Sequence, residues 1–570
     1  MGWLLRRLTR LLKLLLLSPL LLLRRLVGLF VKPDLLRIHL RGEVPDFSSA
    51  SKLQKLLSKR PPHLSLHEAV TAIDEACQPG LGLKGILIEL DQCQLAWIQA
   101  EALIAAIERA RKAGLKVLVW GDSMTGPALA VAAQGDQSLG SSQGVIGFLG
   151  IRVRNLFVRD LLEQVGVVPL IHRHGAYKSM GDMFNRQEMS EAHREMSEEL
   201  AQDLYAQISA PVASGRSLSA DALRGLLDAS PVSHPEAVAA GLLDGEAFRD
   251  ELEEKAGAMI ELEDPSKARV LAPEHLIARR RGRNWRRSVW SDPPVLQVIE
   301  LRGSIVDGET GRGCPATLAC EALDEAREDD DVKAVVLRID SPGGSVTASE
   351  RIWRAVKRLD QEKPVVASMG RVAASGGYYI AVGARAIVAH PGTLTGSIGV
   401  VLGKFNAGPA LRRLGVSVDG VQVGARAGLL DPDRGLDPDE DAALVRHLMA
   451  YYDAFVGRVA EGRQLSKEAV DAVAQGRVYT GRIAQERGLV DRLGGLRLAI
   501  ELAKQEAELG EFVSLERVRV KDERGVAASL LGGSALPSSL LPAGLGELSE
   551  AGELLRASAL AWCPLWVEGA

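Results

Sequence analysis

The chain has 570 residues, of which 46% are hydrophobic and 25% are charged, and its formal net charge is −4. This length and composition predict a globular protein with two domains plus additional segments, and the charge gives no general argument for nucleic-acid binding. The five cysteines are irregularly spaced, at Cys77, Cys93, Cys314, Cys320 and Cys563. This spacing matches neither a disulfide framework nor a zinc site, so we expect free thiols. Cys314 and Cys320 would be able to form a disulfide in an oxidising compartment.

The first thirty residues are rich in leucine and basic residues, with no acidic residue before Asp34. Their longest uncharged run, residues 14–23, is shorter than the about 20 apolar residues of a spanning helix, and no small-residue cleavage site follows it. We expect residues 1–32 to anchor the protein to a membrane, either as a cationic amphipathic segment in the interface or as an uncleaved insert whose Arg and Lys reach the headgroups. A disordered tail is the weaker alternative, because it would expose too much leucine to water.

Residues 33–265 are predicted to form a first α/β repeat. It opens with a strand at residues 35–44, and a second buried strand begins at Lys84 (KGILIELD). Apolar runs then alternate with segments of helical periodicity, which is typical of βαβ units and a parallel sheet.

Lys178, in the segment GAYKS, lies late in this first repeat. Its sequence neighbours are apolar or aromatic, and desolvation in such a setting can lower the pKa of a lysine from about 10.4. A single lysine is otherwise most often an ordinary surface residue. The neighbours are Tyr177, Met180, Met183 and Phe184.

Residues 266–294 are predicted to be a basic linker, with six arginines between Arg279 and Arg287. A solvated linker is the simpler interpretation of this charge run. Contact with anionic lipid headgroups is the alternative, since Trp285 and Trp290 accompany the arginines.

Residues 295–522 are predicted to repeat the first domain. The strand KAVVLRID begins at Lys333 and Gly415 opens GVSVDG, which place them 249 residues after Lys84 and Gly166 (333 − 84 and 415 − 166). The copies differ where chemistry would need them to differ. Ser375 replaces Gly126, Ala427 replaces Lys178, and the loop DSPGGS (340–345) replaces DQCQLA (91–96). One active site shared by two copies would produce this pattern.

Ser375, in RVAASGGYY, is the candidate nucleophile. It lies between a predicted strand and a predicted helix, where the free N–H groups of a helix start point outward, and the glycines after it let a substrate backbone approach. The DSPGGS loop follows a buried strand, and its N–H groups together with that of Gly376 would form an oxyanion hole. Either motif alone is a weak signal that also fits packing or a turn. Lys178 is one candidate base, and His390 is the main alternative.

These motifs together resemble the long, duplicated form of the signal peptide peptidase A family, also called protease IV. The likeness spans about residues 33–515 and includes DSPGGS, MGRVAASGGYYIA, TLTGSIGV and GAYKS in the family's order. It implies two tandem repeats of the Clp protease/crotonase-like α/β fold. It also implies that Ser375 is the nucleophile, that Lys178 is the general base, and that Ser397 orients the lysine. Gly344 and Gly376 would supply the oxyanion N–H groups. The family's Asn is Asp340 here, which leaves the glycines intact.

The resemblance implies a membrane-associated serine endopeptidase that degrades residual signal peptides and other unfolded peptides, without cofactor or metal. It implies a bowl-like homo-oligomer, a homotetramer, anchored to the bacterial inner membrane with its catalytic part in the periplasm. Membrane lipid and peptides would be its partners, and no nucleic acid is expected. A crotonase-type enzyme acting on acyl-CoA and a non-catalytic membrane scaffold are the alternatives. Residues 523–570, rich in small residues, prolines and leucines, are expected to be a weakly ordered tail.

Overall fold

The fold was analysed in a computed structural model, which describes residues 32–48, 64–288, 292–309, 313–520, 560–562 and 566–568. The predicted membrane anchor (residues 1–32) lies outside the described residues except for its last residue. The predicted tail (523–570) lies outside them except for the strands β23 (Leu560–Trp562) and β24 (Trp566–Glu568). Within the described part of the chain, no helix has the length and apolar character needed to cross a membrane.

The chain divides into two compact units that cut across the two sequence copies. Of the described residues, those up to 152, those from 204 to 293 and residue 568 belong to unit 1, and those from 153 to 203 and from 294 to 567 belong to unit 2. Residues 153–203 belong to the first copy in sequence but to unit 2 in space. Lys178 therefore lies in the same unit as Ser375.

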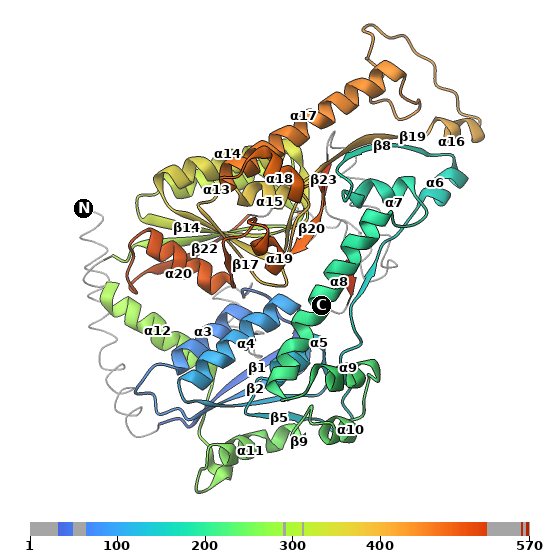
Figure 1. The fold of residues 1–570 in the computed structure, drawn as a ribbon. Coiled ribbons are helices and arrows are strands. Elements are labelled where there is room, and N and C mark those ends of the chain that lie inside the picture. Colours follow the sequence, from blue (N-terminus) through green and yellow to red (C-terminus); the bar gives the residue numbers. More distant parts are fainter. Residues whose placement is uncertain are drawn as a thin grey trace. The chain divides into compact units, whose positions relative to one another are not determined.

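Unit 1 is built on a six-stranded parallel sheet in the order β10-β1-β2-β3-β5-β9. Figure 1 shows α3, α4 and α5 on one face of this sheet and α11 on the other. The strands are β1 (Leu35–Glu43), β2 (Gly85–Gln94), β3 (Lys116–Gly121), β5 (Gln137–Gly140), β9 (Gly245–Glu246) and β10 (Val270–Leu271). The helices are α3 (Leu66–Ala76), α4 (Trp97–Lys112), α5 (Gly126–Ala132) and α11 (Leu252–Met259).

Unit 2 repeats this plan with an eight-stranded sheet in which only the β18–β20 pair is antiparallel. Helices α13, α14 and α15 cover one face and α20 the other (Figure 1). The strands are β11 (Val295–Arg302), β14 (Val332–Ser341), β16 (Val365–Ala374), β17 (Ala386–Ala389), β18 (Leu394–Gly396), β20 (Val478–Thr480), β21 (Arg492–Leu493) and β22 (Ser514–Arg519). The helices are α13 (Ala316–Glu328), α14 (Val346–Glu362), α15 (Gly376–Ala381) and α20 (Leu496–Glu506).

The remaining elements connect these layers or border the sheets. In the first copy they are β4 (Met124–Thr125), β6 (Ile146–Gly147), β7 (Arg152–Arg154), α6 (Arg159–Val165), β8 (Val168–His174), η1 (Ser179–Gly181), α7 (Asp182–Asn185), α8 (Glu191–Gly215), α9 (Ala220–Asp228), α10 (His234–Ala239), η2 (Arg249–Glu251), η3 (Pro265–Lys267) and α12 (Pro273–Ser288). In the second copy they are β12 (Ile305–Val306), β13 (Cys314–Pro315), β15 (Gly343–Ser345), β19 (Val400–Asn406), α16 (Gly408–Arg413), α17 (Pro438–Arg463), α18 (Lys467–Val473) and α19 (Gly481–Glu486).

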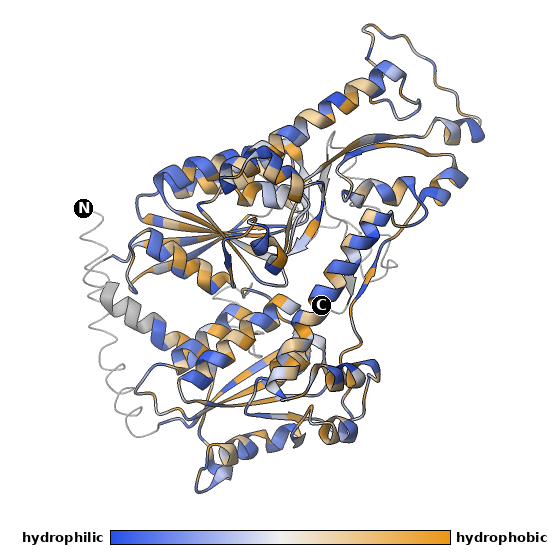
Figure 2. Ribbon diagram, in the orientation of Figure 1, coloured by the Kyte–Doolittle hydropathy of each residue, from blue (hydrophilic) through white to orange (hydrophobic). Residues whose placement is uncertain are grey.

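The central strands are buried on both faces, as continuous apolar runs in a parallel sheet predict. Ile86, Leu87 and Ile88 of β2 have no exposed surface, and neither have Val336 and Leu337 of β14. Figure 2 shows the hydrophobic colour concentrated along these strands. Helix cover on both faces leaves the carboxyl ends of the strands as the place where loops can build a site.

The duplication extends to individual contacts. Arg216 donates to both carboxylate oxygens of Asp244 at 2.6 and 2.9 Å, and Arg463 does the same to Asp491 at 2.6 and 2.8 Å. Each aspartate also accepts a backbone N–H at 2.7 Å, from Ser138 in one copy and from Ile387 in the other. Both copies therefore use the same clamp, in which the arginine at the end of a long helix (α8 or α17) holds the aspartate that precedes a short strand (β9 or β21).

The basic segment between the copies is helical over much of its length. Helix α12 covers residues 273–288, which include the run of arginines, and it packs against α3 in unit 1. Leu276 of α12 is 1% exposed and provides its buried contact.

A third sheet, within unit 2, joins the two copies. Its order is β13-β12-β15-β23-β19-β8. Strand β8 of the first copy pairs antiparallel with β19 of the second, from Val400 opposite His174 to Asn406 opposite Val168. The chain leaves β8 directly into the segment that carries Lys178, so this pairing sets the position of the lysine.

Candidate active site

Ser375 occupies a sharp turn between β16 and α15, as the sequence predicts. Its backbone has φ 54° and ψ −116°, a conformation that costs free energy for any residue with a side chain. Its N–H donates to the carbonyl of Gly396 at 2.8 Å, which holds the turn. Tyr378 fixes the helix behind it by donating its hydroxyl to the carbonyl of Leu489 at 2.9 Å, and burial raises the pKa of this hydroxyl. The turn is therefore held from both sides.

Lys178 brings its amine to Ser375 and Ser397. Its Nζ lies 2.8 Å from Ser375 Oγ, 3.0 Å from Ser397 Oγ and 3.1 Å from the Ser397 carbonyl oxygen. The exposed fractions of Lys178, Ser375 and Ser397 are 1%, 0% and 2%. Ser375 and Lys178, which the comparison of the copies singled out, thus form one buried hydrogen-bonded group with Ser397, which the family resemblance implied.

The backbone of Lys178 is held by residues that the sequence did not single out. Arg173 donates to the carbonyls of Ala176 and Lys178 at 2.9 and 3.1 Å, and it pairs with Asp182 at 3.3 Å. A Cβ placed on Gly476 would lie 2.5–2.6 Å from the N, Cα and Cβ atoms of Lys178. The lysine loop is thus packed directly against the chain that precedes β20.

That chain, residues 475–477, also positions Ser397. The carbonyl of Arg477 accepts the N–H of Ser397 at 2.7 Å, and the carbonyl of Gln475 accepts the N–H of Tyr177 at 2.9 Å. The Arg477 guanidinium lies 4.4 Å from the centre of the Tyr177 ring and pairs with Glu199 at 2.8 Å. One short segment therefore supports the lysine and the serine that accepts its hydrogen bonds. No local motif signals this role, because these contacts use backbone atoms and a common surface residue type.

The glycines predicted to form an oxyanion hole lie next to each other. A Cβ on Gly376 would lie 3.3 Å from the N of Gly344 and 2.5 Å from Ser349 Oγ. A Cβ on Gly344, whose φ is +154°, would lie 2.0 Å from the carbonyl oxygen of Ile305. Because Gly376 directly follows Ser375, both backbones approach the serine, and neither has space for a side chain.

Asp340 begins the glycine-rich loop and lies between two arginines. Its Oδ2 is 3.5 Å from Arg302 and 4.0 Å from Arg371, and its Oδ1 accepts the N–H of Val372 at 3.2 Å. These partners explain how a carboxylate is accommodated where the family resemblance leads one to expect an amide.

His390, the alternative base in the sequence, packs elsewhere. A Cβ on Gly495 would lie 2.7 Å from its Cε1 and Nε2 atoms, so the imidazole lies against the start of α20. The amine that contacts Ser375 is that of Lys178. Among the residues whose positions are described, no group of His, Cys, Asp and Glu has the arrangement of a metal site, and the four described cysteines are free thiols.

The comparison with known families decides the identity. The model of peptidase family S49 matches residues 109–263 and 357–510, once in each copy, and a Clp protease model matches residues 306–392. The chain belongs to peptidase family S49. It is a serine peptidase with two tandem copies of the Clp protease-like α/β fold.

Two relatives align with this S49 peptidase over most of its length, and others align over part of it. The chloroplastic serine protease SPPA of Arabidopsis thaliana is 31% identical over 84% of this chain and 70% of its own length. Protease 4 of Haemophilus influenzae is 30% identical over 78% of this chain and 73% of its own. A protein of Enterococcus faecium named for a signal peptide peptidase, SppA, is 36% identical over 37% of this chain and 61% of its own. A ClpP1 mutant from Listeria monocytogenes aligns in structure with a TM-score of 0.25 and 14% identity, over 36% of this chain and 94% of that chain.

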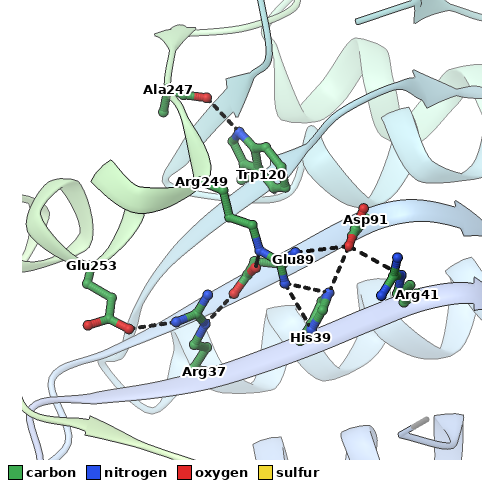
Figure 3. Close-up of polar contacts among 9 residues, drawn as sticks. All are labelled: Arg37, His39, Arg41, Glu89, Asp91, Trp120, Ala247, Arg249 and Glu253. Carbon is green, nitrogen blue, oxygen red and sulfur yellow. Dashed lines mark hydrogen bonds and ion pairs between the residues drawn. The ribbon is translucent and has the colours of Figure 1, made fainter. Parts of the chain in front are cut away.

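The first copy of this S49 peptidase has an ion-pair network at the position where the second copy has the start of the glycine-rich loop. Gly126, which stands in place of Ser375, begins α5, and Asp91, which stands in place of Asp340, contacts Arg249, Arg41 and His39 (Figure 3). Besides the Arg37–Glu89 pair, the contacts are Arg249–Asp91 at 3.2 Å, Arg41–Asp91 at 3.6 Å, His39–Asp91 at 3.2 Å, Arg249–Glu89 at 3.0 Å and Arg37–Glu253 at 2.6 Å.

Asp122 lies beside Asp91 in this network. Burial and the neighbouring Asp91 carboxylate raise the pKa of Asp122, while the pKa of Asp91 is lowered by its hydrogen bonds to His39 and Asp122, against the effect of burial. The first copy thus retains charges at this edge of its sheet, but Gly126 leaves it without the serine.

Proposed function

We propose that Ser375 is the nucleophile of this peptidase and that Lys178 is its general base. The observation that carries the proposal is the 2.8 Å separation of Lys178 Nζ and Ser375 Oγ in a buried setting. Only a neutral amine can accept the serine proton, and burial favours the neutral form of an amine. Ser397, which also contacts Nζ, keeps the amine directed at Ser375.

The reaction proceeds in two halves. Lys178 takes the hydroxyl proton of Ser375 as Oγ bonds to the peptide carbonyl carbon, and the carbonyl electron pair moves onto oxygen. When the intermediate collapses, the C–N bond breaks and the Lys178 ammonium returns its proton to the leaving amine. Water then attacks the ester with Lys178 again as base, which releases the acid and restores Ser375.

The N–H groups of Gly344 and Gly376 stabilise the oxyanion in both halves. Their backbones lie together beside Ser375, and each is packed too closely to carry a side chain. Preorganised donors of this kind are worth about 10²–10³ in kcat when one is removed.

The proposed substrates are unfolded peptides, including signal peptides left after preprotein cleavage. The name of the Enterococcus faecium relative supports this class, and so does the leucine-rich basic N-terminus, which suits attachment beside such substrates in a membrane. We further propose a bacterial inner-membrane location with a periplasmic catalytic part, and assembly into a homo-oligomer of four subunits. Relatives named Protease 4 come from bacteria, which supports the cellular setting.

A fluorophosphonate probe and three variants test the catalytic roles. The wild-type protein should be labelled at Ser375 and cleave casein. Ser375→Ala should lose labelling and more than about a thousandfold of the activity. Lys178→Ala should be equally inactive, and Lys178→Arg should not restore activity because a guanidinium does not deprotonate. Ser214→Ala, which changes an exposed serine of α8, is the matched control and should keep wild-type activity. Activity retained in Lys178→Ala, or labelling retained in Ser375→Ala, would assign the roles to other residues.

A further inference from the structure

Three polar side chains close in sequence to Lys178 are buried and have atoms without a protein partner. Within the described part of the chain, neither ring nitrogen of His193, nor the hydroxyl of Ser197, nor the Oδ2 atom of Asp182 forms a hydrogen bond. These three residues are 2%, 5% and 3% exposed. Buried polar atoms nearly always have a partner, which is a buried water where the chain provides none. The three side chains therefore indicate a bound molecule.

His193 and Ser197 belong to one face of α8. They lie four residues apart on the helix, so their side chains are neighbours. Ser209, further along α8, shows the bond that a helical serine commonly makes, because its hydroxyl donates to the carbonyl of Tyr205, four residues earlier, at 2.6 Å. Ser197 makes no such bond in the described structure. Its hydroxyl is therefore directed to a group beside the helix, next to the imidazole.

Asp182 connects the imidazole to the segment that carries Lys178. Burial lowers the pKa of His193 to about 4, and the Asp182 carboxylate opposes this by raising the pKa, so the two side chains lie close together. The Oδ1 atom of Asp182 pairs with Arg173 at 3.3 Å. Arg173 in turn donates to the carbonyl of Lys178 at 3.1 Å. The carboxylate therefore has one oxygen tied to the base and one oxygen facing the polar side chains.

We propose that His193, Ser197 and Asp182 bind a buried water molecule. The water accepts hydrogen bonds from the imidazole N–H and the Ser197 hydroxyl and donates one to Asp182 Oδ2. About three hydrogen bonds to otherwise unpaired polar atoms are typical of a buried water. Because Asp182 holds Arg173, the water keeps the backbone of Lys178 in place. His193 and Ser197 are thus positioning residues that act on the base through Asp182.

The charges around the imidazole favour a neutral molecule over an ion. With a pKa of about 4, His193 is uncharged at neutral pH, and the Asp182 carboxylate already has Arg173 as its counter-charge. Arg173 and Arg194 are the other charged groups that act on the imidazole, and both would repel a cation. Among the described residues, no group of His, Cys, Asp and Glu is arranged to hold a metal. Water is neutral and both donates and accepts, as these partners require.

The water site and its effect on catalysis are tested separately. The effect rests on the proposed role of Lys178 as the base, whereas the water site does not. If Lys178→Ala kept its activity, the proposed function would fail and the water site would remain.

A crystal structure of the full-length protein, at a resolution that shows ordered water, tests the site. A water should lie about 2.7–3.2 Å from Asp182 Oδ2, from Ser197 Oγ and from one ring nitrogen of His193. In a double variant with His193→Leu and Ser197→Ala, two of the three partners are lost and this water should be absent. A direct bond between the imidazole and the carboxylate, a bound ion, or no density at this place in the wild type would overturn the proposal.

Steady-state kinetics on a peptide ester tests the effect on the base. Ser197→Ala should lower kcat about tenfold and leave KM nearly unchanged, since small displacements of a catalytic group cost up to about 10²-fold while substrate contacts stay intact. Ser209→Ala is the matched control on the same helix, because its hydroxyl bonds only within α8, and it should keep the wild-type kcat.

The imidazole is tested by a pair of variants with opposite hydrogen-bonding capacity. His193→Leu leaves the water without its ring donor and should lower kcat at least as much as Ser197→Ala. His193→Gln retains an N–H donor and should recover part of that loss. Circular dichroism and activity per folded molecule correct for any loss of fold. Equal kcat for Ser197→Ala and Ser209→Ala, or no recovery in His193→Gln, would show that the water does not position Lys178.

Discussion

Gly344 and Gly376, which we propose form the oxyanion hole, differ in the atoms that surround them, so substitutions at the two positions should act in different ways. The nearest obstacle to a Cβ at Gly376 is the hydroxyl of Ser349 at 2.5 Å, a side-chain atom that a substitution can remove. The nearest obstacle at Gly344 is the backbone carbonyl of Ile305 at 2.0 Å, which no substitution removes.

We predict that Gly376→Ala and Gly344→Ala both lower kcat, by about 10²–10³ if one oxyanion donor is displaced. Adding Ser349→Ala should restore part of the activity of Gly376→Ala and none of that of Gly344→Ala. Steady-state kinetics on a peptide ester, with circular dichroism as the folding control, measures both. Equal rescue of the two variants, or rescue of neither, would contradict the geometry described here.

Much of the site was predictable at the level of residues, for a physical reason. Ser375, Lys178, Ser397, Gly344 and Gly376 have chemistry or conformational needs that restrict the residue type, so comparison of the copies and the motif resemblance find them. Their catalytic roles stay predictions until variants are measured. Arg173 and residues 475–477 act through backbone contacts and packing, which many sequences can supply, and no motif marks them.

At the scale of elements, the short chain before β20 is the support of the lysine loop. Gly476 has φ +75°, and a Cβ there would overlap the backbone of Lys178. Gly488 has the same φ of +75° but nothing within 4 Å of a Cβ. The two glycines therefore form a matched pair in which the backbone strain of a substitution is equal and only the contact with the lysine loop differs.

We predict that Gly476→Ala displaces Lys178 and loses most of the peptidase activity, whereas Gly488→Ala costs about 1 kcal/mol of stability from the left-handed backbone and keeps the activity. Activity per folded molecule, with thermal unfolding followed in parallel, distinguishes the two effects. Similar activity of the two variants would mean that the contact between Gly476 and Lys178 does not position the base.

The Arg216–Asp244 and Arg463–Asp491 clamps predict a contribution to the free energy of unfolding that depends on pH. Burial opposes ionisation of Asp491, but its bonds with Arg463 and the Ile387 N–H prevail and lower its pKa; the pKa of Asp244 is lowered in the same way by Arg216 and Ser138. A carboxyl group with a lowered pKa in the folded state stabilises the fold above its unfolded pKa of about 3.9, and this stability is lost as pH falls through the folded value.

Asp491→Asn and Asp244→Asn should therefore lower the melting temperature at pH 7, and the difference from wild type should shrink as the pH falls below about 4. Differential scanning calorimetry across pH measures this difference. Asp453→Asn, which changes the exposed partner of Lys467, is the control and should have little effect at any pH. If the decrease in melting temperature caused by the Asn substitutions stayed constant down to low pH, the negative charge of these aspartates would contribute nothing to the stability of the fold.

The βαβ units of both copies were predictable because their periodicity is local. Buried apolar strands alternate with amphipathic helices, and the offset of 249 residues makes each copy a check on the other. The pairing of β8 with β19 was not predictable, because it joins residues more than 200 positions apart through backbone hydrogen bonds that carry no sequence pattern. For the same reason the sequence did not reveal that residues 153–203 pack in unit 2.

At the scale of the whole molecule, the duplication produces one serine–lysine pair per chain. The first copy has Gly126 in place of the serine, and the second has Ala427 in place of the lysine. Strand β8 carries the first copy's lysine into unit 2 of the same chain, where its amine contacts Ser375.

Mixing two inactive chains tests whether the site is completed within one chain. When Ser375→Ala and Lys178→Ala subunits are co-expressed and purified through two tags as a mixed oligomer, every chain lacks one partner of its own pair. Activity on casein should stay at the background of either variant alone. If serine and lysine came from neighbouring chains, random mixing would place an intact serine beside an intact lysine at about one junction in four, and activity would return to about a quarter of wild type. The wild-type protein carried through the same two-tag purification gives the reference activity, and a mixed oligomer that reaches a quarter of it would place the site between chains.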